Sequence, residues 1–287
     1  MIFVETYLRP KSLQQALEAL ASPGHKFRIL AGGTDLYLDL KREGQKVDIL
    51  DIGLLEECKT IKKVAGGLQI GAGVTFTQLE QSALIERLAS PLKCAAADVG
   101  SPQIRNVGTI GGNLVKASPA ADSVTALVAM DAVVFLQSQE GKRTLPVADF
   151  LKGAYQTALL PNELLVSVFV PNCSQYTWGF TKLGRRRAGA ISLFTAAIGL
   201  EVAEDKTIES ARVSLGAVAQ NPYRSEMLET LLIGKNTEVA LSEELLEAAT
   251  VQVMQTVGQR PELPYKKAGI SGIISETFEK ALAKGEV

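Results

Sequence analysis

IRNVGTIGGNL, residues 104–114, is the stretch of this chain that says most about its fold. It begins with apolar, strand-like sequence, and Arg105 and Asn106 follow, two side chains that can bind phosphate. Three glycines then fall within five positions, at 108, 111 and 112. Because glycine has no Cβ, main-chain N–H groups in such a loop can converge on an anion. The stretch therefore predicts a phosphate-binding loop.

A second glycine pair lies near the N-terminus, in AGGTDL at residues 31–36. It follows the strand-like FRIL at 27–30 and opens a helix-like stretch. A helix N-terminus has free N–H groups, so it can bind phosphate. Two such loops suit a ligand with two linked phosphates, and a dinucleotide cofactor is the favoured ligand. The alternative, that residues 31–36 form only a turn, stays open.

Several other classes of protein are disfavoured. Neither glycine segment matches the GxGxxG of a Rossmann fold or the phosphate loop of a P-loop nucleotidase. The formal net charge is -1 and the chain has no long basic run, which argues against nucleic acid as a ligand. The sequence shows no stretch of about 18 apolar residues and no signal-peptide pattern, so we expect no membrane span and a cytoplasmic protein.

Cysteine and histidine are too few and too scattered to form a metal site. Cys58, Cys94 and Cys173 contain no C-x-x-C pairing, so the chain shows no zinc or iron–sulfur ligand set of its own. His25 is the only histidine, and it lies in a predicted turn. We expect no metal ligands, no catalytic acid or base, and no functional role for His25.

The chain divides into two predicted domains. At 287 residues it is long for a single hydrophobic core. Residues 1–173 form the first domain, with lobes at about 1–55 and 56–173, and residues 174–287 form the second. Predicted strands cover 27–30, 47–52, 68–73, 133–136, 164–170, 178–183, 191–202 and 211–218, and predicted C-terminal helices cover 225–233, 242–257 and 270–283.

Four segments occur in an order that resembles a known family: AGGTDL at 31, IRNVGTIGGNL at 104, SPAAD at 118 and KLGRRR at 182. Together they resemble the FAD-binding subunits of molybdenum hydroxylases, the group of xanthine, nicotinate and carbon monoxide dehydrogenases. The resemblance covers the whole chain. It implies an α+β fold, with a two-lobed, PCMH-like FAD-binding domain. A smaller C-terminal domain with a three-stranded antiparallel sheet and helices would follow.

The resemblance also implies a set of FAD-binding residues. The two glycine loops would hold the pyrophosphate through main-chain amides and through Thr and Asn side chains. Asp122 would bind cofactor hydroxyls, although it could simply cap its helix. Leu165 would pack on the adenine, although an apolar strand residue is usually core, and Lys182 would lie near the flavin. The implied binding residues are Leu30, Ala31, Gly32, Gly33, Thr34, Asp35, Ile104, Gly108, Thr109, Ile110, Gly111, Gly112, Asn113, Asp122, Leu165 and Lys182.

The role of Arg185, Arg186 and Arg187 stays open. They form either a solvated loop or a positive region that favours the reduced flavin and attracts an anionic acceptor. Ala188, Gly189 and Ala190 follow, where xanthine members often have acidic residues, which leaves the electron acceptor undecided.

By this resemblance, the chain accepts electrons from a small [2Fe–2S] subunit. They come from a large molybdopterin subunit that oxidises a purine or other N-heterocycle, and they pass on to NAD or another acceptor. Two alternatives stay open. One is a nucleotide- or flavin-binding module with a regulatory role, and the other is a self-contained flavin oxidase.

Overall fold

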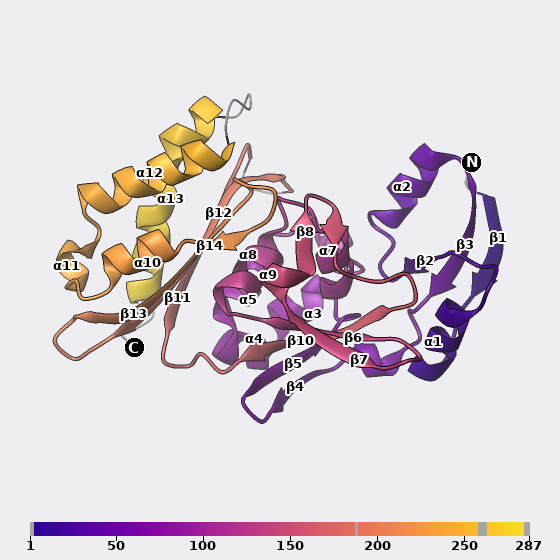
Figure 1. Ribbon diagram of the computed structural model, residues 1–287. Coiled ribbons are helices and arrows are strands. Elements are labelled where there is room, and N and C mark those ends of the chain that lie inside the picture. Colours follow the sequence, from indigo (N-terminus) through magenta and orange to yellow (C-terminus); the bar gives the residue numbers. More distant parts are fainter. Residues whose placement is uncertain (1–2, 187–188, 258–262, 284–287) are drawn as a thin grey trace.

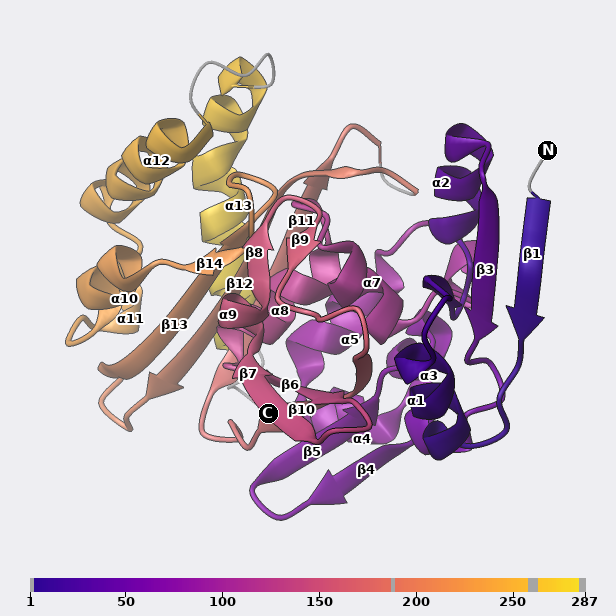
Figure 2. The same ribbon diagram turned by 45° about the vertical axis from the view of Figure 1, so that its right-hand side comes forward.

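The computed structural model describes residues 3–186, 189–257 and 263–283. Figure 1 shows a small N-terminal lobe in indigo, a central lobe in purple and magenta, and a C-terminal part in orange and yellow. Figure 2, turned by 45°, shows the same succession. Helices and separate small sheets are mixed throughout, which confirms the predicted α+β class.

The N-terminal lobe is a three-stranded parallel sheet in the order β1-β3-β2, with a helix on each face. The strands are β1 (Phe3–Leu8), β2 (Phe27–Leu30) and β3 (Lys46–Asp51), and the helices are α1 (Leu13–Ala21) and α2 (Leu36–Glu43). Successive strand residues point to opposite faces. Leu50 of β3 therefore packs with Leu17 of α1, while Ile49 packs with Leu40 of α2.

The central lobe contains a five-stranded antiparallel sheet in the order β4-β5-β10-β6-β7. Its strands are β4 (Ile61–Val64), β5 (Gly67–Gly71), β6 (Val133–Gln137), β7 (Lys142–Pro146) and β10 (Leu164–Pro171). Its helices are α3 (Phe76–Gln81), α4 (Ala83–Leu88), α5 (Ser90–Ala97), α6 (Pro102–Arg105), α7 (Ile110–Lys116), α8 (Asp122–Ala129) and α9 (Val147–Phe150). Every residue of α8 is buried, as in a helix surrounded by protein. The lobe also holds the 3-10 turn η1 (Glu56–Cys58) and the short strands β8 (Leu151–Gly153) and β9 (Gln156–Thr157).

The C-terminal part is an antiparallel sheet in the order β11-β12-β13-β14, packed between α8 and a layer of helices. The strands are β11 (Thr177–Gly184), β12 (Ser192–Val202), β13 (Ile208–Gly216) and β14 (Tyr223–Arg224). The helices are α10 (Glu226–Leu232), α11 (Thr237–Ala240), α12 (Glu243–Val257) and α13 (Leu263–Ala283). The three predicted long strands are present, and β14 adds two residues at the edge.

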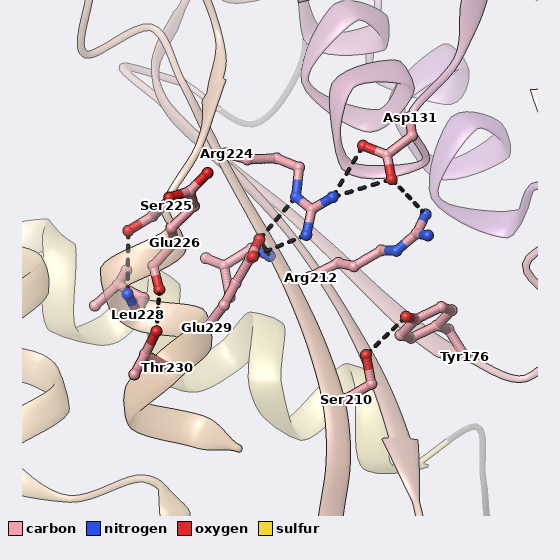
Figure 3. Close-up of polar contacts among 11 residues, drawn as sticks. Asp131, Tyr176, Ser210, Arg212, Arg224, Ser225, Glu226, Leu228, Glu229 and Thr230 are labelled. Atoms are coloured by element: carbon pink, nitrogen blue, oxygen red, sulfur yellow. Dashed lines mark hydrogen bonds and ion pairs between the residues drawn. The ribbon is translucent and has the colours of Figure 1, made fainter.

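A cluster of charged side chains joins this sheet to the end of α8 (Figure 3). Asp131 accepts two hydrogen bonds from Arg224, at 2.9 and 3.0 Å. Arg224 also donates two hydrogen bonds of 2.8 Å to Glu229 of α10. The Arg212 guanidinium lies 3.2 Å from Asp131 and 4.7 Å from the centre of the Tyr176 ring. The cluster therefore holds the C-terminal sheet against the central lobe.

Two sequence-based expectations need correction. The strand-like start of residues 104–114 belongs to the short helix α6 and the turn after it. Pro102 takes the first position of α6, where its fixed φ suits a helix, and the Ser101 hydroxyl accepts a hydrogen bond from the Ile104 amide. Helix α13 begins at Leu263 and not at 270.

We predict that Gly179→Ala destabilises the C-terminal sheet. A Cβ at Gly179 of β11 would lie 1.9 Å from the Thr277 carbonyl oxygen of α13. Such overpacking lowers the free energy of unfolding by about 1–3 kcal/mol. Gly272→Ala is the matched control in α13, since its Cβ meets no heavy atom within 4 Å. There we expect a gain of about 1 kcal/mol from helix propensity.

Urea unfolding of the two variants and the parent measures both effects. Parent-like stability of Gly179→Ala would contradict the close packing of β11 on α13.

Candidate functional site

A cavity of about 500 Å³ lies between the N-terminal and central lobes. Its walls come from the β2–α2 loop, from α6 and α7 with the loop between them, and from residues 157–165. Residues of α2 and of α7 both line it, and Figure 2 shows these helices in neighbouring lobes. The cavity brings together most of the residues named from the sequence: Ala31, Gly32, Gly33, Thr34, Asp35, Ile104, Gly108, Thr109, Gly111, Gly112, Asn113 and Leu165.

The first glycine loop presents free main-chain donors to this cavity. Among the described residues, none accepts a hydrogen bond from the amides of residues 32–35. Gly33 has φ +71°, a left-handed conformation that favours glycine. Asp35 immediately precedes α2 and makes no side-chain cap, so the positive end of the helix dipole remains available. Amides without an acceptor at a helix N-terminus are the kind of donors that can bind an anion.

The second glycine loop differs from our expectation. The amides of Ile110 and Gly111 donate to the carbonyls of Val74 and Ala72, at 3.0 and 2.9 Å. The Gly112 amide donates to Thr109 Oγ1 at 3.1 Å, and the Asn113 amide donates to the Thr109 carbonyl at 3.0 Å. All four amides therefore have acceptors within the protein, at Thr109 and in the segment that follows β5, and the binding of FAD by residues 109–113 stays a prediction.

The glycines of both loops allow close packing of main chain. A Cβ at Gly32 would lie 2.0 Å from the Val107 carbonyl oxygen, so the two loops touch at this point. A Cβ at Gly111 would lie 2.6 Å from Ala72 Cβ. Gly112 differs, since its Cβ would approach only Thr109 Oγ1, at 3.0 Å. Gly112 therefore leaves space in the cavity wall.

Four residues named from the sequence lie outside the cavity lining. Leu30 ends β2 beside Asp51, directly before the first loop. Ile110 is fully buried in the core beneath the second loop. Asp122 and Lys182 lie next to each other in a separate buried polar cluster.

Asp122 starts α8 and accepts hydrogen bonds from two side chains of the C-terminal sheet. Lys182 Nζ of β11 lies 2.7 Å from its Oδ2 and also donates to the Asp98 carbonyl at 2.8 Å. The Ser192 hydroxyl of β12 donates to Oδ1. Burial raises the pKa of the Asp122 carboxyl above its ordinary value, and the Lys182 ammonium opposes that rise. The Asp122 side chain does not cap α8. Its hydrogen bonds with Lys182 and Ser192 instead join the central lobe to the C-terminal sheet.

An ion pair at the cavity was missed by the sequence reasoning. Lys116 Nζ of α7 lies 2.7 Å from Asp39 Oδ2 of α2, and both residues line the cavity. Lys116 Nζ also lies 5.5 Å from the centre of the Tyr155 ring. The signal was present, since Lys116 and Asp39 follow Asn113 and Asp35 at the three- and four-residue spacings that share a helix face.

The remaining candidates lie away from this pair. Arg186 donates to the Gly189 carbonyl at 2.8 Å, while Arg187 and Ala188 fall outside the described residues. His25 Nδ1 lies 3.0 Å from Asp48 Oδ2, and His25 does not line the cavity. Among the described residues, no group of three or more His, Cys, Asp or Glu side chains is placed to hold a metal ion.

Two known families match consecutive parts of the chain. Residues 3–173 match the FAD binding domain in molybdopterin dehydrogenase. Residues 179–278 match the CO dehydrogenase flavoprotein C-terminal domain. The chain belongs to the FAD-binding subunits of the molybdenum hydroxylases. FAD is therefore the cofactor, and free amides at a cavity of ligand size fit its pyrophosphate.

Individual relatives of this FAD-binding subunit act on different substrates. It is 32% identical to the nicotinate dehydrogenase FAD-subunit of Eubacterium barkeri, over 95% of this chain and 94% of the relative. It is 34% identical to caffeine dehydrogenase subunit beta of a Pseudomonas species, over 80% and 78%. The carbon monoxide dehydrogenase structure from Hydrogenophaga pseudoflava aligns with a TM-score of 0.86 at 28% identity, covering 97% of both chains.

Within the described part of the FAD-binding subunit, no helix is both long and apolar enough to cross a membrane.

We predict that Lys182→Met destabilises the subunit in the absence of FAD. The substitution leaves the Asp122 carboxylate, only 5% exposed, without its cation. Removing one partner of a buried ion pair costs about 3–5 kcal/mol of the free energy of unfolding. Glu276→Gln is the control, because it removes a half-exposed pair with Lys280, and its melting midpoint should match the parent. A stable Lys182→Met apoprotein would show that the buried pair is not structurally important.

Proposed function

We propose that this subunit transfers electrons within a molybdenum hydroxylase complex. It would accept them from a small [2Fe–2S] subunit, as a large molybdopterin subunit oxidises a purine or other N-heterocycle, and pass them to NAD or another acceptor. Nicotinate and caffeine, named for two relatives, are both N-heterocycles and support that substrate class. Carbon monoxide dehydrogenase, in the same family, is named for a substrate that is not an N-heterocycle.

The observation that supports the proposal is that residues 32–35 line a cavity between two lobes and have amides without an acceptor among the described residues. The two cations that line this cavity already have partners, Arg28 with Glu43 and Lys116 with Asp39. Recognition of the pyrophosphate would therefore fall mainly on main-chain N–H groups. A volume of about 500 Å³ is within the ordinary range for cofactor sites.

The other named residues would complete the binding site. Gly112 and Asn113 would face the ligand from α7, and Ile104 and Leu165 would contribute apolar wall. Asp122 would bind cofactor hydroxyls and Lys182 would lie near the flavin, while their ion pair joins α8 to the C-terminal sheet. Bound flavin supplies a redox chemistry that amino-acid side chains lack. The part of this chain is to bind it, orient it and shield it from water.

We also propose that the chain has two domains, residues 1–173 with lobes at about 1–55 and 56–173, and residues 174–287. Two large groups of buried residues support this division. One lies mainly in the central lobe and the other in the C-terminal part. Trp178 and Phe180 of β11 pack with the first group, so the proposed domains share an apolar contact.

We predict that the purified chain carries one FAD held without a covalent bond. The cavity supplies amide donors and apolar wall, and none of the described cysteines or histidines lines it. Acid precipitation should release free FAD into the supernatant, where its absorption spectrum and chromatographic mobility identify it. Release of FMN, or flavin that remains in the pellet, would count against the proposal.

We predict that Gly112→Val loses FAD while the protein remains folded. Gly112 lines the cavity, and a Cβ there would approach only Thr109 Oγ1, at 3.0 Å, so a branched side chain should take up ligand space. Gly111→Ala is the matched control at the neighbouring position. Its Cβ would collide with Ala72, so it should lower the melting midpoint. FAD titration followed by fluorescence, together with thermal unfolding, separates the two effects. Parent-like FAD affinity in Gly112→Val would refute this site.

The electron-transfer role predicts slow reduction of the isolated subunit. With no partner chain present, a purine or N-heterocycle should bleach the flavin absorbance only slowly. Co-purification from the native source should bring molybdenum and iron with the chain. Rapid bleaching without partners would favour a self-contained oxidase, and FAD binding without molybdenum or iron would favour a regulatory module.

A further inference from the structure

We propose that Ser123 is a positioning residue that sets the orientation of the Asn113 side-chain amide, so that its NH₂ group faces a phosphate of the bound ligand. This inference rests on the proposed FAD site. It concerns a residue outside the cavity lining, one that acts through Asn113.

The contact is a single buried hydrogen bond. The Ser123 hydroxyl of α8 donates to Asn113 Oδ1 of α7 at 2.7 Å, and Ser123 is completely buried. An asparagine amide has nearly the same shape when turned by 180°, but its donor and acceptor exchange places. The Ser123 hydroxyl could accept from the flipped amide as well, but its own proton would then lack a partner, since no other acceptor for it occurs among the described residues. Because an unsatisfied buried donor is costly, donation to Oδ1 favours one of the two orientations.

The selected orientation leaves a donor for the ligand. Asn113 lines the cavity, and with Oδ1 engaged its NH₂ group is the part left to face that space. No acceptor for Asn113 Nδ2 occurs among the described residues. The opposite orientation would present the amide oxygen to the phosphate, and the two partly negative groups would repel each other. Ser123 thus favours an anionic ligand without carrying a charge.

Helix α8 is well held on both sides of Ser123. Asp122 pairs with Lys182 at 2.7 Å, and the Thr125 hydroxyl lies 2.9 Å from that of Thr195. These contacts attach the start of α8 to two strands of the C-terminal sheet. Ser123 is therefore a fixed donor, and Asn113 must orient toward it.

A double-mutant cycle tests the proposal, with FAD titrated into the apoproteins of Ser123→Ala, Asn113→Ala and the double variant. We expect Ser123→Ala to weaken FAD binding on the order of tenfold, the effect of one hydrogen bond. In the Asn113→Ala background the same change should have no further effect, because its target is gone. Thr277→Val is the control, since it removes another buried hydroxyl, one that donates to the Ile273 carbonyl within α13; it should lower stability and leave FAD affinity unchanged.

Asn113→Asp tests the direction of the amide. Its carboxylate can still accept from Ser123, but it places an oxygen where the NH₂ group was. We expect weaker binding of FAD and of ADP than in Asn113→Ala, with adenosine binding equally to both. Equal factors for Ser123→Ala in both backgrounds, no effect of Ser123→Ala, or equal affinity of Asn113→Asp and Asn113→Ala would overturn the proposal. Failure of the parent chain to bind FAD would instead refute the underlying function.

Discussion

The cavity depends on one close contact between main chains of different lobes. Gly32 lies so near the Val107 carbonyl that a Cβ would come within 2.0 Å of it. This contact places the β2–α2 loop of the small lobe against the turn before α7, and the space beside it becomes the site. The ion pair between Asp39 of α2 and Lys116 of α7 is a second contact between the two lobes. A ligand held here contacts both lobes, so its binding energy also stabilises their arrangement.

The two glycine loops have different tasks, although they look alike in the sequence. The amides of residues 32–35 are free, whereas those of residues 110–113 donate within the protein. The longer motif is thus held by its own hydrogen bonds, while the shorter one keeps amides without protein acceptors, which under the proposed function would serve an anion. Because the lining cations are paired with carboxylates, main-chain dipoles carry most of the electrostatic work. Main-chain amides do not titrate, so their attraction for an anion does not change with pH as that of a titrating side chain would.

Much of this arrangement could be predicted from the sequence, for identifiable reasons. Glycine pairs located both loops, although only the first follows a strand, and strand-like apolar runs located β10, β11 and β12. Which amides remain free could not be predicted, because Val74 and Ala72 accept from the second loop across a gap of more than thirty residues. The pairing of Asp122 with Lys182 was also out of reach. It needs the relative position of α8 and β11, which depends on packing of the whole C-terminal sheet.

Amide hydrogen exchange of the apoprotein and the FAD-bound protein tests the central claim most directly. The account predicts that the amides of residues 32–35 exchange rapidly without FAD and become protected when it binds. The amides of residues 110–113 should be protected in both states, because their acceptors belong to the protein. Protection gained at residues 110–113 with none at residues 32–35 would contradict the account, and would return the phosphate site to the second loop.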